Sequence, residues 1–322
     1  VAPLRWFWVA LLGWRMTVRL YQGLHAYMNS KEREDIYRLS SDQDFKDITQ
    51  KILNDKTVPR EVKEPIIKQN RKIYIFKYFS QSHPVAGFIS YLPKAKYSSI
   101  FLRGGNGHFG IMRPNNLFAF IPETTVVGTL YRGNVYEDDI NDQLGGEDLK
   151  DVEELLKAIT KLKIKYNLEF PQPKTLIGAS RGAMQMVAAF THSEYLKNRI
   201  KLLVSISGNL NFKITDKERI EMHYLFNKKF SEQTKFKNFQ DWLAYRDPTQ
   251  LISLLPNKIK FILFYGLKDN RVPISEQLSF ISELDKYKIP YEFIKYKNTE
   301  HSMDGMHKSM SSKIQDEMRL LN

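Results

Sequence analysis

The chain has 322 residues, 42% of them hydrophobic and 26% charged, so it can bury a large core without disulfides or a structural metal. It contains no cysteine, which excludes disulfide frameworks, thiolate metal sites and cysteine nucleophiles. Its formal net charge of +13 comes from lysines spread along the chain among acidic residues, without a recognised nucleic-acid-binding module, and therefore predicts no nucleic acid partner.

The first predicted element is an apolar segment at residues 1–15. Residues 6–14 form an apolar run with three tryptophans between Arg5 and Arg15, and this run is too short to span a bilayer. Three interpretations remain open: a secretory signal without a clear cleavage site, an anchor at a membrane surface, or a leader or helix packed on the main domain. The compartment therefore also remains open between cytoplasm, membrane surface and secretion.

Residues 16–71 are predicted to form a helical extension. They are mostly polar and lack strand-like runs. Their apolar residues recur at helical spacing, as at Phe45, Ile48, Ile52 and Leu53.

Residues 72–322 are predicted to form one α/β domain. Two runs rich in aromatic and β-branched residues, 72–79 and 85–92, are separated by a turn and predict antiparallel strands. After them, helix-like stretches, including an amphipathic helix at 147–166, alternate with short apolar runs at 98–102, 125–130, 175–178, 202–206, 261–265 and 291–296. This pattern predicts a mostly parallel central sheet flanked by helices, in the order found in α/β-hydrolases.

A serine flanked by glycines lies between one of these strands and a helix-like run. The motif Gly-Ala-Ser-Arg-Gly occupies residues 178–182, with Ser180 at its centre. Such a turn forces unusual backbone angles on the serine and exposes its hydroxyl at a helix N-terminus, where developing negative charge is stabilised. The alternative is an ordinary serine in a glycine-rich turn, because a bare five-residue match is weak.

An acid and a histidine follow later strands in the order that a serine nucleophile of this fold requires. The serine hydroxyl needs a base, and the base needs an orienting acid. Asp269 follows one apolar run and His301 follows the next, so both reach the sheet edge that carries Ser180. A loop aspartate or histidine alone is usually structural, but the order of the three favours a catalytic triad over the nearest competitors, Asp304 and His307.

The loop after the strand at 98–102 is rich in glycine and is a candidate for binding an oxyanion. In this fold one backbone donor comes from the residue after the nucleophile, here Arg181, and another from a loop after an early strand, here Gly104 and Gly105. A phosphate-binding loop is the rival interpretation, but the Gly-Lys-Ser/Thr ending is absent. No cofactor or metal is predicted.

Residues 212–255 are rich in aromatic residues and are predicted to form a short lid-like insertion. Met222, Tyr224 and Trp242 are candidates to line an acyl pocket, together with Asn106 of the glycine-rich loop. Ordinary packing of helices against the sheet is the alternative for the aromatic residues of this segment.

These residues together resemble those of the prolyl oligopeptidase family of α/β-hydrolases, in the small forms that lack a propeller domain. The likeness covers roughly residues 70–322. It is carried by residues 103–106, residues 131–134 leading to residues 142–148 and the helix after them, the elbow at 178–182, residues 266–273 with Glu300 and His301, and Asp247-Pro248.

The resemblance implies a triad of Ser180, Asp269 and His301 and acyl transfer through a covalent acyl-enzyme. Family peptidases often carry a tyrosine just before the loop glycines, and here the position is Arg103. Its guanidinium is expected either to donate to the oxyanion or to attract an anionic group of the substrate. The glutamate pair that binds a substrate amino terminus belongs to a propeller-bearing branch, so the resemblance does not imply peptidase specificity.

Three functional hypotheses follow. The first is a peptidase or esterase acting on a small-molecule or peptide acyl substrate. The second is a lipolytic enzyme held at a membrane surface by the apolar N-terminal segment, and the third is a non-catalytic interaction protein with the same fold. The oligomeric state is not predicted.

Overall fold

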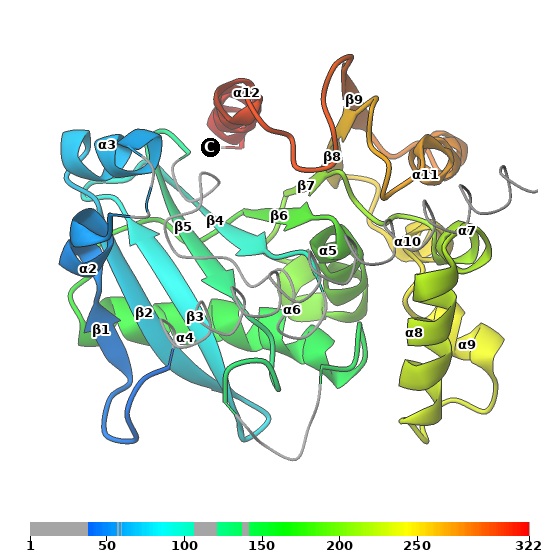
Figure 1. Cartoon of the computed structure of the whole chain (residues 1–322), viewed down its shortest axis with the longest axis horizontal. Helices are drawn as coiled ribbons and strands as arrows, with labels where there is room; N and C mark the ends of the chain where they lie inside the picture. The colour runs from blue at the N-terminus through cyan, green and yellow to red at the C-terminus, as the bar shows by residue number, and fades with distance from the viewer. Residues whose placement is uncertain (1–37, 57, 59, 106–120, 137–141, 322) are drawn as a thin grey trace, which may run out of the picture.

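A computed structural model describes residues 38–56, 58, 60–105, 121–136 and 142–321 (Figure 1). Within these residues the centre of the molecule is a nine-stranded sheet of order β1-β2-β3-β5-β4-β6-β7-β8-β9. The strands are β1 (Phe45–Asp47), β2 (Lys72–Ser80), β3 (His83–Tyr91), β4 (Tyr97–Leu102), β5 (Thr124–Thr129), β6 (Thr175–Ala179), β7 (Leu202–Ile206), β8 (Lys260–Gly266) and β9 (Tyr291–Tyr296).

The sheet is antiparallel at its first edge and parallel beyond it. β1 pairs with β2, β2 with β3 and β3 with β5 in antiparallel register, and every pair from β5 through β4 to β9 is parallel. β4 lies between β5 and β6, so the chain changes direction across the sheet at β4. In an open parallel sheet, such a change opens a crevice at the carboxyl ends of the strands. The predicted α/β-hydrolase fold is confirmed, and its switch point lies between β4 and β6.

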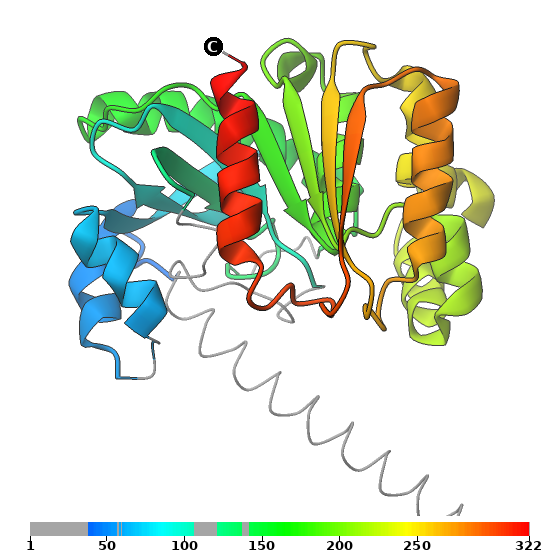
Figure 2. The same cartoon turned by 90° about the horizontal axis from the view of Figure 1, so that it is seen from above.

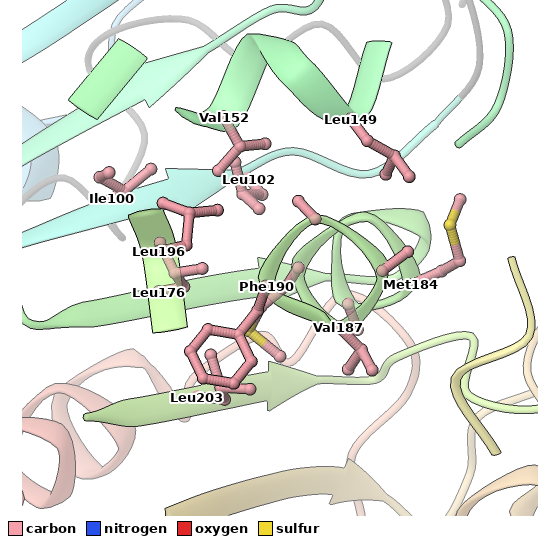
Figure 3. Packing of buried hydrophobic residues seen from close by; sticks show 14 of the residues in the cluster. Ile100, Leu102, Leu149, Val152, Leu176, Met184, Val187, Phe190, Leu196 and Leu203 are labelled. Carbon is pink, nitrogen blue, oxygen red and sulfur yellow. The ribbon is translucent and has the colours of Figure 1, made fainter. Parts of the chain in front are cut away.

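Most of the helices cover one face of the sheet. Buried apolar residues of α4 lie at the predicted helical spacing and pack with α5 against β4, β6 and β7 (Figure 3). The helices of this side are α4 (Lys150–Lys165), α5 (Arg181–His192), α6 (Glu194–Lys197), α7 (Phe212–Glu218), α8 (Ile220–Ser231), α9 (Phe239–Ala244), α10 (Pro248–Leu251) and α11 (Ile274–Lys286), with short 3-10 helices at Glu147–Leu149 and Ile252–Leu254. α5 is the most enclosed of them, because every residue from Arg181 to Thr191 is buried.

Among the described residues, three helices cover the opposite face. α12 (His307–Arg319) packs Met310, Ile314 and Met318 against β6, β7 and β8. α2 (Thr49–Asn54) and α3 (Arg60–Lys68) pack against β2 and β3. Figure 2 shows α12 on the opposite side of the sheet from α4. The sheet is therefore covered on both faces, as a mostly parallel sheet requires.

The N-terminal extension differs from the prediction. Phe45–Asp47 forms a strand that pairs with β2, where the sequence predicts only helix. The ring of Phe45 lies 4.0 Å from that of Tyr166 and 4.7 Å from that of Tyr74, so pairing at the sheet edge also buries an aromatic contact. The expectation of an entirely helical extension is wrong here, because long-range pairing outweighs the local helical spacing.

Residues 1–37 lie outside the described residues, and with them the apolar N-terminal segment. None of the helices in the part of the chain that the structure describes is long and apolar enough to cross a membrane.

Candidate active site

Ser180 occupies a tight turn between β6 and α5. β6 ends at Ala179 and α5 begins at Arg181, and Ser180 adopts φ 51° and ψ −120° between them. This backbone conformation costs on the order of 1–3 kcal/mol, which the surrounding contacts must offset. The Ser180 N–H donates to the carbonyl of Ile206, and the Ser180 carbonyl accepts from the N–H of Asn209. Both bonds tie the turn to the end of β7.

The two glycines of the motif are required by close approach of the backbone. A Cβ atom on Gly178 would lie 2.3 Å from the carbonyl oxygen of Gly182, and one on Gly182 would lie 2.1 Å from that of Leu102. α5 can therefore pack directly on the ends of β4 and β6 only because these positions lack side chains. The sequence motif corresponds to this steric requirement.

His301 and Asp269 reach Ser180 from the loops after β9 and β8. His301 Nε2 lies 3.1 Å from Ser180 Oγ, and His301 Nδ1 lies 2.8 Å from Asp269 Oδ2. The side chain of Asp269 is fully buried and that of His301 is 15% exposed. The structure thus brings together the three residues that the sequence order selects.

Hydrogen bonds and close packing fix the loop that carries Asp269 and hold it to the loop that carries His301. Asp269 Oδ1 accepts the N–H groups of Arg271 and Val272, at 2.8 and 3.0 Å, so the other carboxylate oxygen remains directed at His301. The N–H of Lys268 donates to the carbonyl of Thr299. A Cβ atom on Gly266 would lie 2.3 Å from the same carbonyl oxygen, which shows how closely the loops approach.

Gly104 lies beside Ser180 on the other side of the site. A Cβ atom built on Gly104 would lie 3.0 Å from Ser180 Cβ and 3.7 Å from Ser180 Oγ. Gly105 has φ +72°, in the left-handed region that glycine enters readily. The loop after β4 and the first residue of α5, Arg181, therefore flank Ser180 as the sequence predicts, while Asn106 lies outside the described residues.

The side chain of Arg103 does not take the role predicted for it. Arg103 is 1% exposed, and its guanidinium donates to the carbonyls of Gly104, at 2.9 Å, and Leu130, at 3.3 Å. It also lies 5.2 Å from the ring centre of Tyr131. Because the guanidinium is directed into the protein, the expected contact with an oxyanion or an anionic substrate group is wrong.

The side chain of Arg181 forms a buried charge network. Its guanidinium is bonded to both carboxylate oxygens of Asp142, at 2.5 Å each, and to Asp148 Oδ2, at 3.1 Å. Burial alone would raise the pKa of Asp142, but the charge and hydrogen bonds of Arg181 outweigh burial and hold this pKa well below its usual value. Burial, with the neighbouring Asp142, raises the pKa of Asp148. Sequence reasoning missed this network, because Asp142 and Asp148 lie in a segment rich in polar and acidic residues, where neither carboxylate stands out.

The residues predicted to line an acyl pocket are scattered. Trp242 is fully buried, donates its ring N–H to Gln233 and lies 4.1 Å from the guanidinium of Arg246. Met222 is buried in the core, whereas Tyr224 is 69% exposed. Trp242 is therefore a core residue and the prediction of a substrate contact for it is wrong, because the bulk of a tryptophan is used in packing between helices.

The described residues include no group of three or more histidine, aspartate or glutamate side chains placed to hold a metal ion. The hydrogen-bonded Ser180, His301 and Asp269 side chains and the flanking backbone N–H groups are the chemical groups gathered at this edge of the sheet.

Several solved structures share this fold. Acylaminoacyl peptidase of Pyrococcus horikoshii has a TM-score of 0.60 and 17% identity over 79% of this chain and 42% of its own. A puromycin-hydrolysing peptidase of Mycobacterium tuberculosis has a TM-score of 0.57 and 17% identity over 76% and 38%. An esterase of Pyrococcus furiosus has a TM-score of 0.55 and 14% identity over 78% and 93%.

The chain thus spans about two fifths of the length of these two peptidases but nearly all of the esterase. At such low identity the likeness shows the fold alone. A search of curated proteins found no match.

A match to a protein-family model is more specific than the likeness to these structures. The model of the prolyl oligopeptidase family matches residues 122–322, which include the elbow and both loops that reach Ser180. The chain therefore belongs to the prolyl oligopeptidase family.

Proposed function

We propose that the chain is a serine hydrolase that cleaves an ester or peptide bond through a covalent acyl-enzyme on Ser180. The observation that carries the proposal is the continuous hydrogen-bonded arrangement from Asp269 through His301 to Ser180 at a strand-to-helix turn. The family membership and the peptidase and esterase neighbours support the same class of reaction.

The acylation step follows from the placement of the three side chains. Ser180 Oγ attacks the acyl carbonyl carbon while its proton passes to His301 Nε2. Asp269 accepts a hydrogen bond from the Nδ1–H of His301, which fixes the tautomer that leaves Nε2 free as the base. The new oxyanion is stabilised by backbone N–H groups of Arg181 and the loop at Gly104 and Gly105. The intermediate then expels an alcohol or amine, which takes the proton from His301.

Deacylation repeats the same steps with water. His301 Nε2 removes a proton from a water molecule, which attacks the carbonyl carbon of the acyl-enzyme. The second tetrahedral intermediate expels Ser180 Oγ, which regains its proton from His301 and releases a carboxylic acid. Water is the only co-reactant that the reaction requires.

The test is covalent labelling with a fluorophosphonate probe. We expect the native chain to be labelled, Ser180→Ala to remain unlabelled, and Asp269→Asn and His301→Ala to be labelled much more slowly. Ser302→Ala is the matched control, because Ser302 neighbours His301 but donates its hydroxyl hydrogen bond to Asp304. Failure of the native chain to label, or equal labelling of Ser180→Ala, would refute the proposal.

The substrate class is addressed by a second experiment. A panel of p-nitrophenyl esters with acyl chains of different lengths, set beside proline-containing dipeptide amides, separates esterase from peptidase activity. We propose that ester cleavage is at least as fast as amide cleavage. Many peptidases of the family carry a tyrosine before the loop glycines, whereas this chain has Arg103, whose buried guanidinium is bonded to the carbonyl of Gly104.

A further inference from the structure

We infer that Tyr131 and the side chain of Arg103 are positioning residues that aim the backbone N–H groups of Gly104 and Gly105, in the glycine loop at residues 103–105, at the oxyanion. The side chain of Arg181 supports them by anchoring the carbonyl of Gly105. The inference rests on the proposed function, since it concerns the same reaction. It assigns a task to three buried polar side chains that the reaction steps above leave unused.

Each of the three successive carbonyl groups of the glycine loop accepts a hydrogen bond from a buried side chain. The Tyr131 hydroxyl donates to the carbonyl of Arg103, at 3.2 Å. Arg103 Nη1 donates to the carbonyl of Gly104, at 2.9 Å, and Arg181 Nη1 donates to the carbonyl of Gly105, at 3.1 Å. Three consecutive peptide groups are therefore held by side chains.

Fixing a carbonyl also fixes the N–H of the next residue. The peptide unit is planar and trans, so its C=O and N–H point in opposite directions. Holding the carbonyls of Arg103 and Gly104 therefore sets the directions of the Gly104 and Gly105 N–H groups. Gly104 itself lies against Ser180, because a Cβ on it would be 3.0 Å from Ser180 Cβ. These N–H groups thus keep a fixed direction beside the nucleophile before any substrate arrives, which is what oxyanion stabilisation needs.

The donors are themselves held rigidly. Both guanidinium groups contact the ring of Tyr131, with their central carbons 5.2 Å (Arg103) and 5.0 Å (Arg181) from the ring centre. Burial raises the pKa of Tyr131, so its hydroxyl stays protonated and able to donate. Asp142 and Asp148 balance the charge of Arg181, which a buried guanidinium requires.

Arg181 links both sides of the oxyanion site. Its backbone N–H lies at the first position of α5, directly after Ser180, and its side chain reaches back to Gly105. A change in the Arg181 side chain is therefore expected to disturb the glycine loop while leaving Ser180, His301 and Asp269 in contact.

The test measures the rate of fluorophosphonate labelling against probe concentration, which separates the maximal rate kinact from the apparent affinity KI. The phosphonyl oxygen gains charge in the transition state as an acyl oxygen does. We expect Tyr131→Phe to lower kinact about tenfold and Arg181→Lys about ten- to a hundredfold, with KI within about twofold, because a misdirected donor stabilises the transition state less.

Arg71→Lys is the matched control. Like Arg103, Arg71 is 1% exposed and donates to backbone carbonyls, in this case those of Ile121 and Thr124. These carbonyls lie at the start of β5, at the amino ends of the parallel strands, whereas Ser180 lies at their carboxyl ends. We expect this variant to lose stability but to keep kinact within about twofold. A thermal unfolding curve of each variant shows whether it is folded at the assay temperature.

The outcomes separate this inference from the proposed function. If the native chain does not label at Ser180, the proposed function itself fails and the inference falls with it. If the native chain labels and folded Tyr131→Phe keeps its kinact, or if Arg71→Lys lowers kinact as much, the positioning role is wrong while the proposed function stands. Tyr131→Phe decides the matter alone if Arg181→Lys does not fold, because it removes only a hydroxyl.

Discussion

The two sides of Ser180 are built by different means. The glycine loop after β4 is held by side chains, namely Tyr131 and the guanidiniums of Arg103 and Arg181. The loops after β8 and β9, which carry Asp269 and His301, are held mainly by backbone hydrogen bonds and by close packing at Gly266, with one buried side-chain bond from the Tyr265 hydroxyl to the carbonyl of Val272. Side-chain substitutions remote from the reacting atoms should therefore disturb the first side, whereas the second side should respond mainly to its own reacting groups and to added bulk.

The largest effect is expected from Asp269→Asn on the second side. The amide oxygen of asparagine can still accept from Arg271 and Val272, so the loop should keep its shape. Its NH2 group would face His301 Nδ1 and favour the wrong tautomer, and we expect kcat/KM to fall about 10⁴-fold. Ester hydrolysis and thermal unfolding measured on the same sample test this. A loss below tenfold with an intact fold would show that Asp269 does not orient the base.

A pH dependence of stability is expected from the buried carboxyl of Glu276 in α11. It accepts hydrogen bonds from the N–H of Leu210, at 3.0 Å, and from the hydroxyl of Thr215, at 2.7 Å. Burial raises its pKa from 4.5 to about 7, against smaller opposing contributions from these bonds and from Arg219. The folded state then holds this proton more tightly than the unfolded state, so the contribution of Glu276 to stability is most favourable below pH 4.5 and falls by about 3 kcal/mol as the pH rises to about 7.

Glu276→Gln isolates this contribution. We expect the difference in free energy of unfolding between variant and native chain to grow in favour of the variant between pH 5 and pH 7.5, in urea titrations at fixed temperature. Parallel pH profiles for the two proteins would mean that Glu276 does not titrate in this range. The result sharpens the comparison, because Glu276, like Asp269, is a buried carboxyl group on the side of the site that follows β8.

Added bulk should disturb the second side directly. A Cβ on Gly266 meets the carbonyl oxygen of Thr299 at 2.3 Å, and backbone atoms cannot move aside without shifting the histidine loop. We expect Gly266→Ala to lower stability by about 2 kcal/mol and to slow fluorophosphonate labelling.

Gly305→Ala is the matched control for Gly266→Ala. A Cβ on Gly305 meets no atom within 4 Å, although its φ of +76° disfavours alanine. A cost of about 1 kcal/mol with unchanged labelling is expected. Equal effects of the two substitutions would show that close packing of the loops does not matter.

The smallest effects are expected in the helical segment 212–255. Trp242→Phe removes part of a fully buried ring and its hydrogen bond to Gln233, and should lower the free energy of unfolding by about 1–2 kcal/mol without changing KM. Tyr224→Ala, at a position 69% exposed, should change stability by less than about 0.5 kcal/mol. A large rise in KM for either variant would restore the predicted substrate contact, and the lid-like role of this segment stays a prediction until then.

Much of the site could be predicted because its parts are local in the sequence. The strand-to-helix turn needs small residues at 178 and 182, and the steric contacts at these glycines show the physical reason. The strands after residue 72 were predictable from apolar runs, and their parallel pairing brings Ser180, Asp269 and His301 to one edge. The side-chain directions of Arg103 and Trp242 were not predictable, since the partners that decide them lie elsewhere in the chain.

The sequence by itself determined the α/β order, the turn at Ser180 and the succession of acid and histidine, because backbone hydrogen bonding and apolar periodicity act between near neighbours. Only the tertiary structure decided that Phe45–Asp47 joins the sheet, that Trp242 belongs to the core, and that Arg103 turns inward to hold Gly104. In each case a deciding contact comes from another element. It is β2 for Phe45–Asp47, Phe226 of α8 for Trp242, and Leu130 and Tyr131 at the end of β5 for Arg103. A buried arginine finds its partners by burial and charge balance, which short sequence windows do not contain.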